Sequence, residues 1–168
     1  MPEISPQKTH EFIAAYDQFS DAIYRHVYFR VYNREAAKDL MQDTFARTWD
    51  YLRKGKEVQN LKAFLYKVAN NLIIDEYRKK KEISLDGLQK NGFDVESPDQ
   101  IKIVQEVENN HALKLVSKLE PHHRDIIVMR YVNDLTIKEI AEIIGQSENV
   151  VSVRINRGVK ELKKLLHV

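Results

Sequence analysis

The sequence predicts an all-α protein made of two small helical domains joined by a flexible linker. Apolar residues recur at spacings of three and four over most of the chain, which is the pattern of one buried helix face. Only five glycines and four prolines interrupt the 168 residues, fewer than a sheet protein would need for its turns. The helical spacing fails between about Glu82 and Asp99, in a short acidic stretch. We therefore expect domains over 6–82 and 101–168, with the linker over 83–100.

Three helices are expected in the first domain. The first runs over 6–31, and Asn33 is a good N-cap for the second, which ends near Gly55. The third follows from Leu61 and runs into the basic cluster 78–81. Their buried stripes are formed by Phe12, Tyr16, Phe19, Ile23 and Val27, then Ala37, Leu40, Met41, Thr44, Phe45 and Thr48, then Leu61, Phe64, Leu65, Val68, Leu72 and Ile73.

The second domain is expected to end in a helix-turn-helix. The helical pattern resumes over 101–119, and Pro121 fits the first turn of the next helix. Thr136 with Glu139 forms a capping box, and Gly145 supplies the left-handed residue that ends this short helix. Ser147 then caps the final helix. The apolar positions of these helices are Ile126, Ile127, Met129 and Tyr131, then Leu135, packed on Ile140, and finally Val151, Ile155, Leu162 and Leu166.

The exposed side of the final helix carries side chains that suit DNA. Amides, hydroxyls and guanidinium groups contact base edges and phosphates when such a helix lies in the major groove, and a valine can meet a thymine methyl group. A purely structural αα-hairpin would more often carry Glu and Lys at four-residue spacing. The residues expected to contact DNA here are Asn149, Ser152, Val153, Arg154, Asn156 and Arg157.

The charge distribution supports two modules that each face a polyanion, rather than one uniformly charged body. The net charge is only +2, but five basic residues stand against two acids from Gly145 onward, and 83–110 carries six acids against two lysines. In the third helix, aromatics alternate with Lys, Arg and paired Asn, which suits unstacked bases, although a packed helix with a solvated basic end fits equally well. On composition alone, the acids of 39–49 are a solvated face over core aromatics.

Three segments in this order resemble the sigma-70 family of bacterial sigma factors. They are 39–49, 64–71 and 119–157, and together the likeness extends from about Phe12 to Leu166. The chain looks like the short, extracytoplasmic-function (ECF) type, which keeps only sigma regions 2 and 4. The resemblance implies an alternative sigma factor that binds core RNA polymerase, recognises the −35 and −10 promoter elements and initiates transcription.

The resemblance also assigns roles to residues and names partners. It implies that Asp39, Gln42 and Asp43, with Phe45 and Trp49 beneath or beside them, dock on the β′ clamp helices of core polymerase, whose β subunit is a further partner. The final helix would read the −35 element of promoter DNA, the acidic linker would thread through the polymerase, and relatives of this kind commonly have an anti-sigma factor. The residues that would melt and hold the −10 element are Tyr66, Lys67, Asn70, Asn71 and Arg78.

The sequence departs from the family pattern at three positions. Ser152 stands where a basic residue is common, Val153 replaces a small polar residue, and Phe64 replaces a frequent Trp. The first two changes put the −35 preference in doubt, whereas the third keeps an aromatic ring. The promoter sequence and the inducing signal do not follow from the residues.

An alternative reading from another class is a polymerase-independent helix-turn-helix regulator with an N-terminal sensing or dimerisation domain. An enzyme is a more distant reading, since no phosphate loop or nucleophile motif is present. His122 and His123 point about 100° apart on a helix and no third ligand is near in the sequence, so no metal site and no cofactor are expected. No cysteine, no apolar run of ~20 residues and no leader in 1–10 predict a cytoplasmic protein without membrane insertion.

Overall fold

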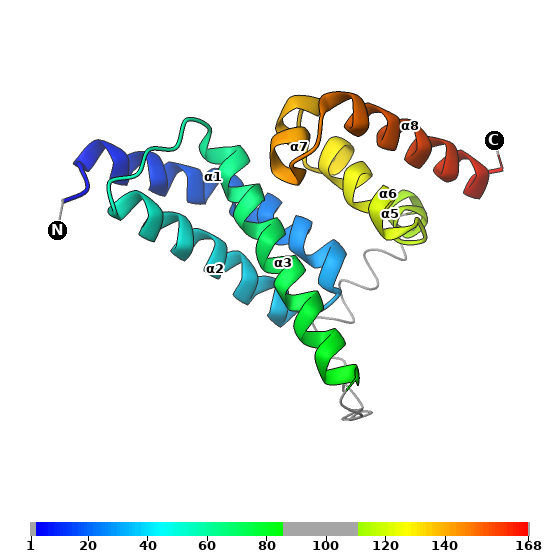
Figure 1. Ribbon diagram of the computed structural model, residues 1–168, viewed down its shortest axis with the longest axis horizontal. Coiled ribbons are helices and arrows are strands. Elements are labelled where there is room, and N and C mark those ends of the chain that lie inside the picture. Colours follow the sequence, from blue (N-terminus) through cyan, green and yellow to red (C-terminus); the bar gives the residue numbers. More distant parts are fainter. Residues whose placement is uncertain (1–2, 86–110, 168) are drawn as a thin grey trace.

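Three long helices form the N-terminal half of the computed structural model, which describes residues 3–85 and 111–167 (Figure 1). Helix α1 spans Pro6–Val31, α2 spans Arg34–Arg53 and α3 spans Leu61–Leu85. Asn33 caps α2 as predicted, because its side-chain oxygen accepts a hydrogen bond from the Ala36 amide at 3.0 Å. The three helices pack on one another through buried residues that include Ile23, Val27, Ala37, Leu40, Phe45, Leu65, Ala69 and Ile73.

Short helices and one long helix form the C-terminal half. Helix α5 spans His111–Ser117, α6 spans Pro121–Ile127, the π-helical turn η1 spans Val128–Val132, α7 spans Ile137–Ile144 and α8 spans Glu148–Leu165. Every regular element within the described residues is helical, which confirms the all-α prediction. None of the helices described is long and apolar enough to cross a bilayer.

The turn of the helix-turn-helix has the predicted caps and the predicted glycine. Among the described residues only the Thr136 half of the capping box forms, because the Glu139 carboxylate pairs with Lys62 Nζ of α3, 3.5 Å away. The Thr136 hydroxyl accepts a hydrogen bond from the Glu139 amide at 3.1 Å and the Ser147 hydroxyl accepts one from the Val150 amide at 3.2 Å. Gly145 ends α7 in the left-handed region with φ of 67°. Leu166 differs from the prediction: it lies beyond the last residue of α8 and is 41% exposed.

The π-helical turn η1 is the element that the apolar spacing did not predict. Its wider turn closes on a hydrogen bond from the Asn133 amide to the Val128 carbonyl at 2.9 Å, five residues back. The extra residue in that turn rotates the following side chains away from the 3.6-residue repeat. Tyr131, predicted as an apolar position of the helix, is therefore 60% exposed, whereas Asn133 is buried.

The two halves of the protein are packed together. Helix α7 lies against α3, and α6 and η1 face α1 (Figure 1). One cluster of buried residues contains side chains from both halves, such as Tyr66 and Ile73 of α3 with Leu135 and Ile140 of the C-terminal half. The predicted linker lies outside the described residues except for 83–85, which are still part of α3, and so does the start of the helix expected at 101.

Candidate nucleic-acid interface

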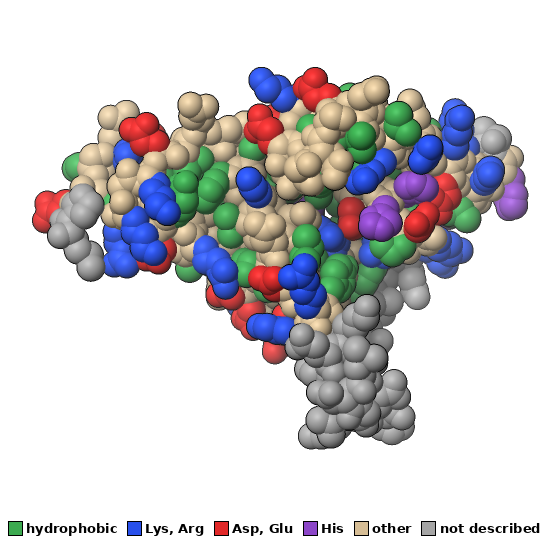
Figure 2. All heavy atoms as spheres, viewed as in Figure 1, with side chains coloured by type: hydrophobic (Ala, Val, Ile, Leu, Met, Phe, Trp, Pro, Cys, Tyr) green, Lys and Arg blue, Asp and Glu red, His purple; other side chains and the backbone are tan. Residues whose placement is uncertain are grey.

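The last helix, α8, presents most of the predicted DNA contacts to solvent. Val151 and Ile155 are buried and hold one side of α8 against α6 and α7, which leaves the opposite side free. Of the six residues predicted to read the −35 element, Ser152 and Arg154 are half-buried and the other four are exposed: Asn149, Val153, Asn156 and Arg157. Lys and Arg side chains gather along this helix on the face that Figure 2 shows.

A cluster of ionisable residues ties the start of α6 to the last turns of α8. His123 Nδ1 contacts the Glu161 carboxylate, and the other Glu161 oxygen accepts a hydrogen bond from the Glu120 amide at 3.0 Å. The expectation that His123 has no further ligand-type neighbour was wrong, since one atom of each of these three side chains lies within 4.8 Å of the others. The hydrogen bond from His123 lowers the pKa of Glu161. The contact fixes α8, and with it the predicted −35 surface, on α6.

The five residues predicted to hold the −10 element are divided by the fold. Lys67, Asn71 and Arg78 are exposed on α3, whereas Tyr66 and Asn70 are buried. Tyr66 packs edge-on against the His26 ring with centroids 5.2 Å apart, and burial raises the pKa of its hydroxyl. In this arrangement of the two halves, Tyr66 and Asn70 are not accessible to a base.

Helix α2 places the predicted polymerase contacts as an exposed strip over an aromatic base. Asp39, Gln42 and Asp43 are exposed, Phe45 is buried, and Trp49 is half-buried against Phe12 of α1, with centroids 4.9 Å apart. The packing thus separates the polar strip from the aromatics that support it.

A groove of about 470 Å³ between α2 and α3 joins two of the predicted surfaces. Asp39 and Asp43 line one wall, and Arg78, predicted to contact the −10 element, lines the other. The residues predicted to bind polymerase and one residue predicted to bind DNA therefore lie beside each other, although they are far apart in the chain.

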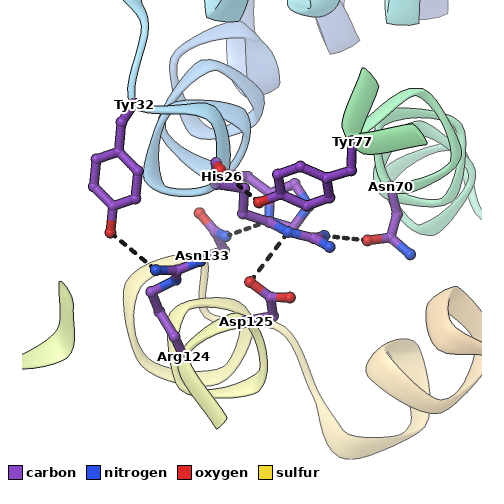
Figure 3. Close-up of polar contacts among 8 residues, drawn as sticks. His26, Tyr32, Asn70, Tyr77, Arg124, Asp125 and Asn133 are labelled. Atoms are coloured by element: carbon purple, nitrogen blue, oxygen red, sulfur yellow. Dashed lines mark hydrogen bonds and ion pairs between the residues drawn. The ribbon is translucent and has the colours of Figure 1, made fainter. Parts of the chain in front are cut away.

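Between the two halves lies a polar cluster that the sequence analysis did not identify (Figure 3). Arg30 of α1 is at its centre, with a side chain that is only 9% exposed. Its guanidinium forms an ion pair with Asp125 of α6, with Nε and Oδ1 3.1 Å apart, and donates a hydrogen bond to the Asn70 side-chain oxygen. The Tyr77 hydroxyl donates to the Arg30 carbonyl. Arg30 thus connects α1, α3 and α6.

Two further contacts join the two halves in the same region (Figure 3). His26 Nδ1 and the Asn133 side-chain nitrogen are 3.4 Å apart, and Arg124 donates to the Tyr32 hydroxyl at 3.3 Å. Burial, with a smaller effect from Arg30, lowers the pKa of His26 to about 3, so the ring is neutral. Burial also raises the pKa of Asp125, against the opposite effect of Arg30. Desolvation therefore offsets much of what the ion pair contributes.

Comparison with known proteins gives the same two regions in the same order. The model of sigma-70 region 2 matches residues 15–83, and the model of sigma-70 region 4 matches residues 112–162. The chain belongs to the ECF group of the sigma-70 family. Region 2 comprises the three-helix half, and region 4 comprises the half that ends in the helix-turn-helix.

Several curated relatives of this sigma-70 family member are named sigma factors, and they align with most of its length. It is 28% identical to the ECF sigma factor BldN of Streptomyces coelicolor over 90% of the chain, but spans only 58% of that protein. It is 29% identical to YlaC and 29% identical to SigW of Bacillus subtilis, of which it covers 88% and 86%.

Two solved structures share the fold. One is the sigma factor RpoE in complex with the anti-sigma factor NepR from Bartonella quintana, with a TM-score of 0.71, 20% identity, and coverage of 94% of this chain and 98% of that one. The other is CnrH in complex with the cytosolic domain of CnrY, with a TM-score of 0.69, 19% identity, and coverage of 95% and 89%.

Proposed function

We infer that the protein is an alternative sigma factor, which binds core RNA polymerase, recognises the −35 and −10 promoter elements and initiates transcription. The observation that carries this inference is the presence of sigma regions 2 and 4 in order on one chain, the second with an exposed recognition helix. The protein acts in the cytoplasm as a dissociable subunit with no catalytic activity of its own.

Each predicted surface has a separate task in this mechanism. The exposed strip of α2 binds the β′ clamp helices, α8 reads the −35 element, and α3 holds the opened −10 strand. Two modest DNA contacts become one strong interaction when core polymerase joins them, because the second contact forms at a high effective concentration. Exposed −10 bases that enter a pocket offset the few kcal/mol needed to unstack them.

An anti-sigma factor is proposed as a further partner. RpoE, which shares this fold, was solved in complex with the anti-sigma factor NepR, and CnrH was solved in complex with the cytosolic domain of CnrY. We expect such a partner to block the binding of core polymerase, a step that does not involve promoter DNA.

Charge reversal on the clamp surface tests this function. Asp43 is exposed on α2, so Asp43→Arg leaves the core intact while placing a cation on the surface proposed to bind polymerase. We expect the wild-type chain to co-elute with bacterial core polymerase and to support transcription from its promoters, and the variant to lose most of this binding.

Asp17→Arg is the matched control, because Asp17 is also an exposed helical aspartate but lies on α1, outside the strip. The control is expected to co-elute like the wild type. Wild-type-like binding by a folded Asp43→Arg variant would falsify the clamp assignment, and failure of the wild type to bind core polymerase would remove the function itself.

The polymerase-independent regulator is not favoured. Region 2 occupies the part of the chain where that reading places a sensing or dimerisation domain. Tight, sequence-specific binding of the free chain to duplex promoter DNA would be the result that supports it.

A further inference from the structure

The contact between α6 and α8 brings together three side chains of the kinds that bind metal ions. Glu120 precedes the first residue of α6, His123 lies in its first turn, and Glu161 lies near the end of α8. One ligand atom from each lies within 4.8 Å of the others, and His123 Nδ1 is 3.9 Å from a Glu120 carboxylate oxygen. Figure 2 shows histidine side chains beside acidic ones on the C-terminal half. One imidazole and two carboxylates thus converge on one point.

The Glu161 carboxylate is held in the orientation that a metal ligand needs. One of its oxygens accepts a hydrogen bond from the Glu120 backbone amide at 3.0 Å, and the other faces His123 Nδ1. In metal sites, the ligands are commonly oriented by hydrogen bonds of this kind from neighbouring groups. The backbone amide therefore fixes the direction of Glu161 whether or not an ion is bound.

A close approach of α8 to α6 allows ligands from both helices to meet. A Cβ added at Gly158 would lie 2.9 Å from Ile127 Cγ1 and 3.5 Å from the Cβ of His123, so the helices are this near only because residue 158 is a glycine. The side chains of His123 and Glu161 are 20% and 31% exposed, whereas Glu120 is 59% exposed. The cluster is therefore shielded on one side and open to water on the other.

The ligand types indicate which class of ion would fit. Imidazole suits zinc and the neighbouring transition metals, whereas calcium and magnesium take oxygen ligands. Zinc also accepts three protein ligands with water in the fourth position. Its ligands lie about 2.0–2.2 Å from the ion and hence roughly 3.3 Å from one another. The exposed Glu120 side chain can close the present 3.9 Å, and the ion would replace the hydrogen between His123 and Glu161.

We propose that Glu120, His123 and Glu161 form a site for a divalent transition-metal ion, with Zn²⁺ as the ion that fits best. The ion would lock the last helix of the protein onto α6. Because Glu161 follows Arg157 by one turn of α8, this lock would also hold the surface proposed to read the −35 element. The site goes beyond the proposed function and does not depend on it. No third ligand was expected, since Glu161 is 38 residues from His123 along the chain and meets it only in the folded protein.

Zinc binding to the full-length chain is the first quantity to measure, by calorimetric titration of protein stripped with EDTA and dialysed. We expect one strong site per chain, which Mg²⁺ at the same concentration does not fill. Glu120→Gln should weaken zinc binding at least about 10-fold, the effect of losing even a group that only supports a metal ligand. The Glu120 side chain is mostly exposed, so this variant is expected to fold like the wild type.

His122→Gln and Glu148→Gln are the matched controls. His122 is the exposed neighbour of His123 on α6, and Glu148 is an exposed acid at the other end of α8 from Glu161. Both controls should bind zinc like the wild type, whereas His123→Gln should lose the site. Equal losses in His122→Gln and His123→Gln would show that zinc binds surface histidines without this cluster.

Unfolding in urea gives the second readout, because an ion that binds only the folded chain stabilises it. At free zinc about 100 times the dissociation constant, the unfolding equilibrium constant should fall about 100-fold. Hydrogen exchange of the α8 amides should slow under the same conditions. In Glu120→Gln the same zinc concentration should change both quantities much less.

Three outcomes would overturn the proposal: no zinc binding by the wild type, binding that Glu120→Gln and His123→Gln leave unchanged, or bound zinc that stabilises neither the chain nor α8. Co-elution of the wild type with core polymerase is measured separately in the presence of EDTA. Its failure would remove the proposed function and would leave the result for zinc as it is.

Discussion

His26 lies five residues before the end of α1 and is fully buried, with the Tyr66 ring packed edge-on against it and the Asn133 side chain beside it. Among the described residues, the one charged group that shifts the pKa of His26 is Arg30, which disfavours a charged imidazole. The residue is thus held neutral by the packing of the two halves. A neutral buried histidine makes stability depend on pH in a definite direction.

We expect stability to fall on acidification because of this residue. The pKa of His26 is lowered from 6.5 to about 3, so the contribution is fully present above pH 6.5 and is lost as pH falls toward 3. The unfolded chain takes up a proton in that window and the folded chain does not, which amounts to about 1.4 kcal/mol per pH unit. Near pH 5 the loss is roughly 2 kcal/mol, measurable by urea unfolding over a pH series.

A difference between variants isolates this contribution from that of the carboxylates. His26→Gln should flatten the pH dependence by about that amount, whereas His10→Gln, at an exposed position of the same helix, should leave it unchanged. An identical slope in wild type and His26→Gln would contradict the assignment.

At this scale, the sequence allowed the exposure of most predicted site residues to be anticipated, but not the burial of polar residues between the two halves. Asp43 and Arg157 could be placed because helix spacing fixes which side of a helix is wet. His26 and Arg30 are four residues apart beside the apolar stripe of α1, a signal that a solvated helix edge would give equally well. Only the partner from the other half, Asp125, distinguishes the two cases.

The element most completely predicted is the turn between α7 and α8. Its caps and its glycine act within a few residues of the chain, so no distant contact is needed to specify them. The π-helical turn η1 is the opposite case. It exchanges four-residue hydrogen bonds for a five-residue one, and the benefit, a buried Asn133 beside His26, comes from α1. The spacing of apolar residues within this segment does not predict a contact with the distant helix α1.

Gly145 gives a test of the turn in isolation. A Cβ added there would meet no atom within 4 Å, so the only penalty of Gly145→Ala is the left-handed backbone at φ of 67°. We expect destabilisation of about 1–2 kcal/mol. Gly145→Asn should lose less, because asparagine adopts this conformation more readily. Equal unfolding midpoints of Gly145→Ala and wild type in urea would show that the turn rearranges instead.

For the whole molecule, the expectation of two separate helical domains captured the regions but not their association. Most positions of the predicted stripes are buried or half-buried, but Tyr16, Tyr131 and Leu166 are exposed. Ile140 of α7 and Tyr66 of α3 share one buried cluster. The spacing of apolar residues predicts which side of a helix is buried, but it does not predict which other helix packs on that side. The pairing of α3 with α7 depends on residues far apart in the chain, which a single sequence does not reveal.

A shared core predicts one cooperative unfolding transition. We expect calorimetry of the wild type to give equal calorimetric and van't Hoff enthalpies, as for a single two-state unit. The double variant Asp125→Asn/Glu139→Lys removes the ion pairs of the C-terminal half with Arg30 and Lys62. It should therefore weaken the contact between the halves and broaden the unfolding transition or divide it in two. Two transitions already present in the wild type would show that the halves unfold independently.

With α7 packed on α3 as in this structure, the protein cannot engage both promoter elements at once. Elements about 25 base pairs apart are separated by roughly 85 Å along a duplex, at ~3.4 Å per base pair. Helices α3 and α7 are in direct contact, so α8 lies far closer to α3 than that. The 25 residues 86–110 join Leu85 to His111, and that length of chain can reach up to roughly 80–90 Å. The chain between the halves is therefore long enough both for the packed arrangement of this structure and for simultaneous binding to the two promoter elements.

The ion pair between Arg30 and Asp125 also constrains how these two positions can change during evolution. A lineage that replaced one of the two residues first would leave a buried charge unpaired, which is strongly unfavourable. Substitutions at the two positions should therefore appear together among descendants of this chain. A recombinant gene that joins this region 2 to a region 4 without an acid at position 125 would begin with an Arg30 that has lost its ion pair.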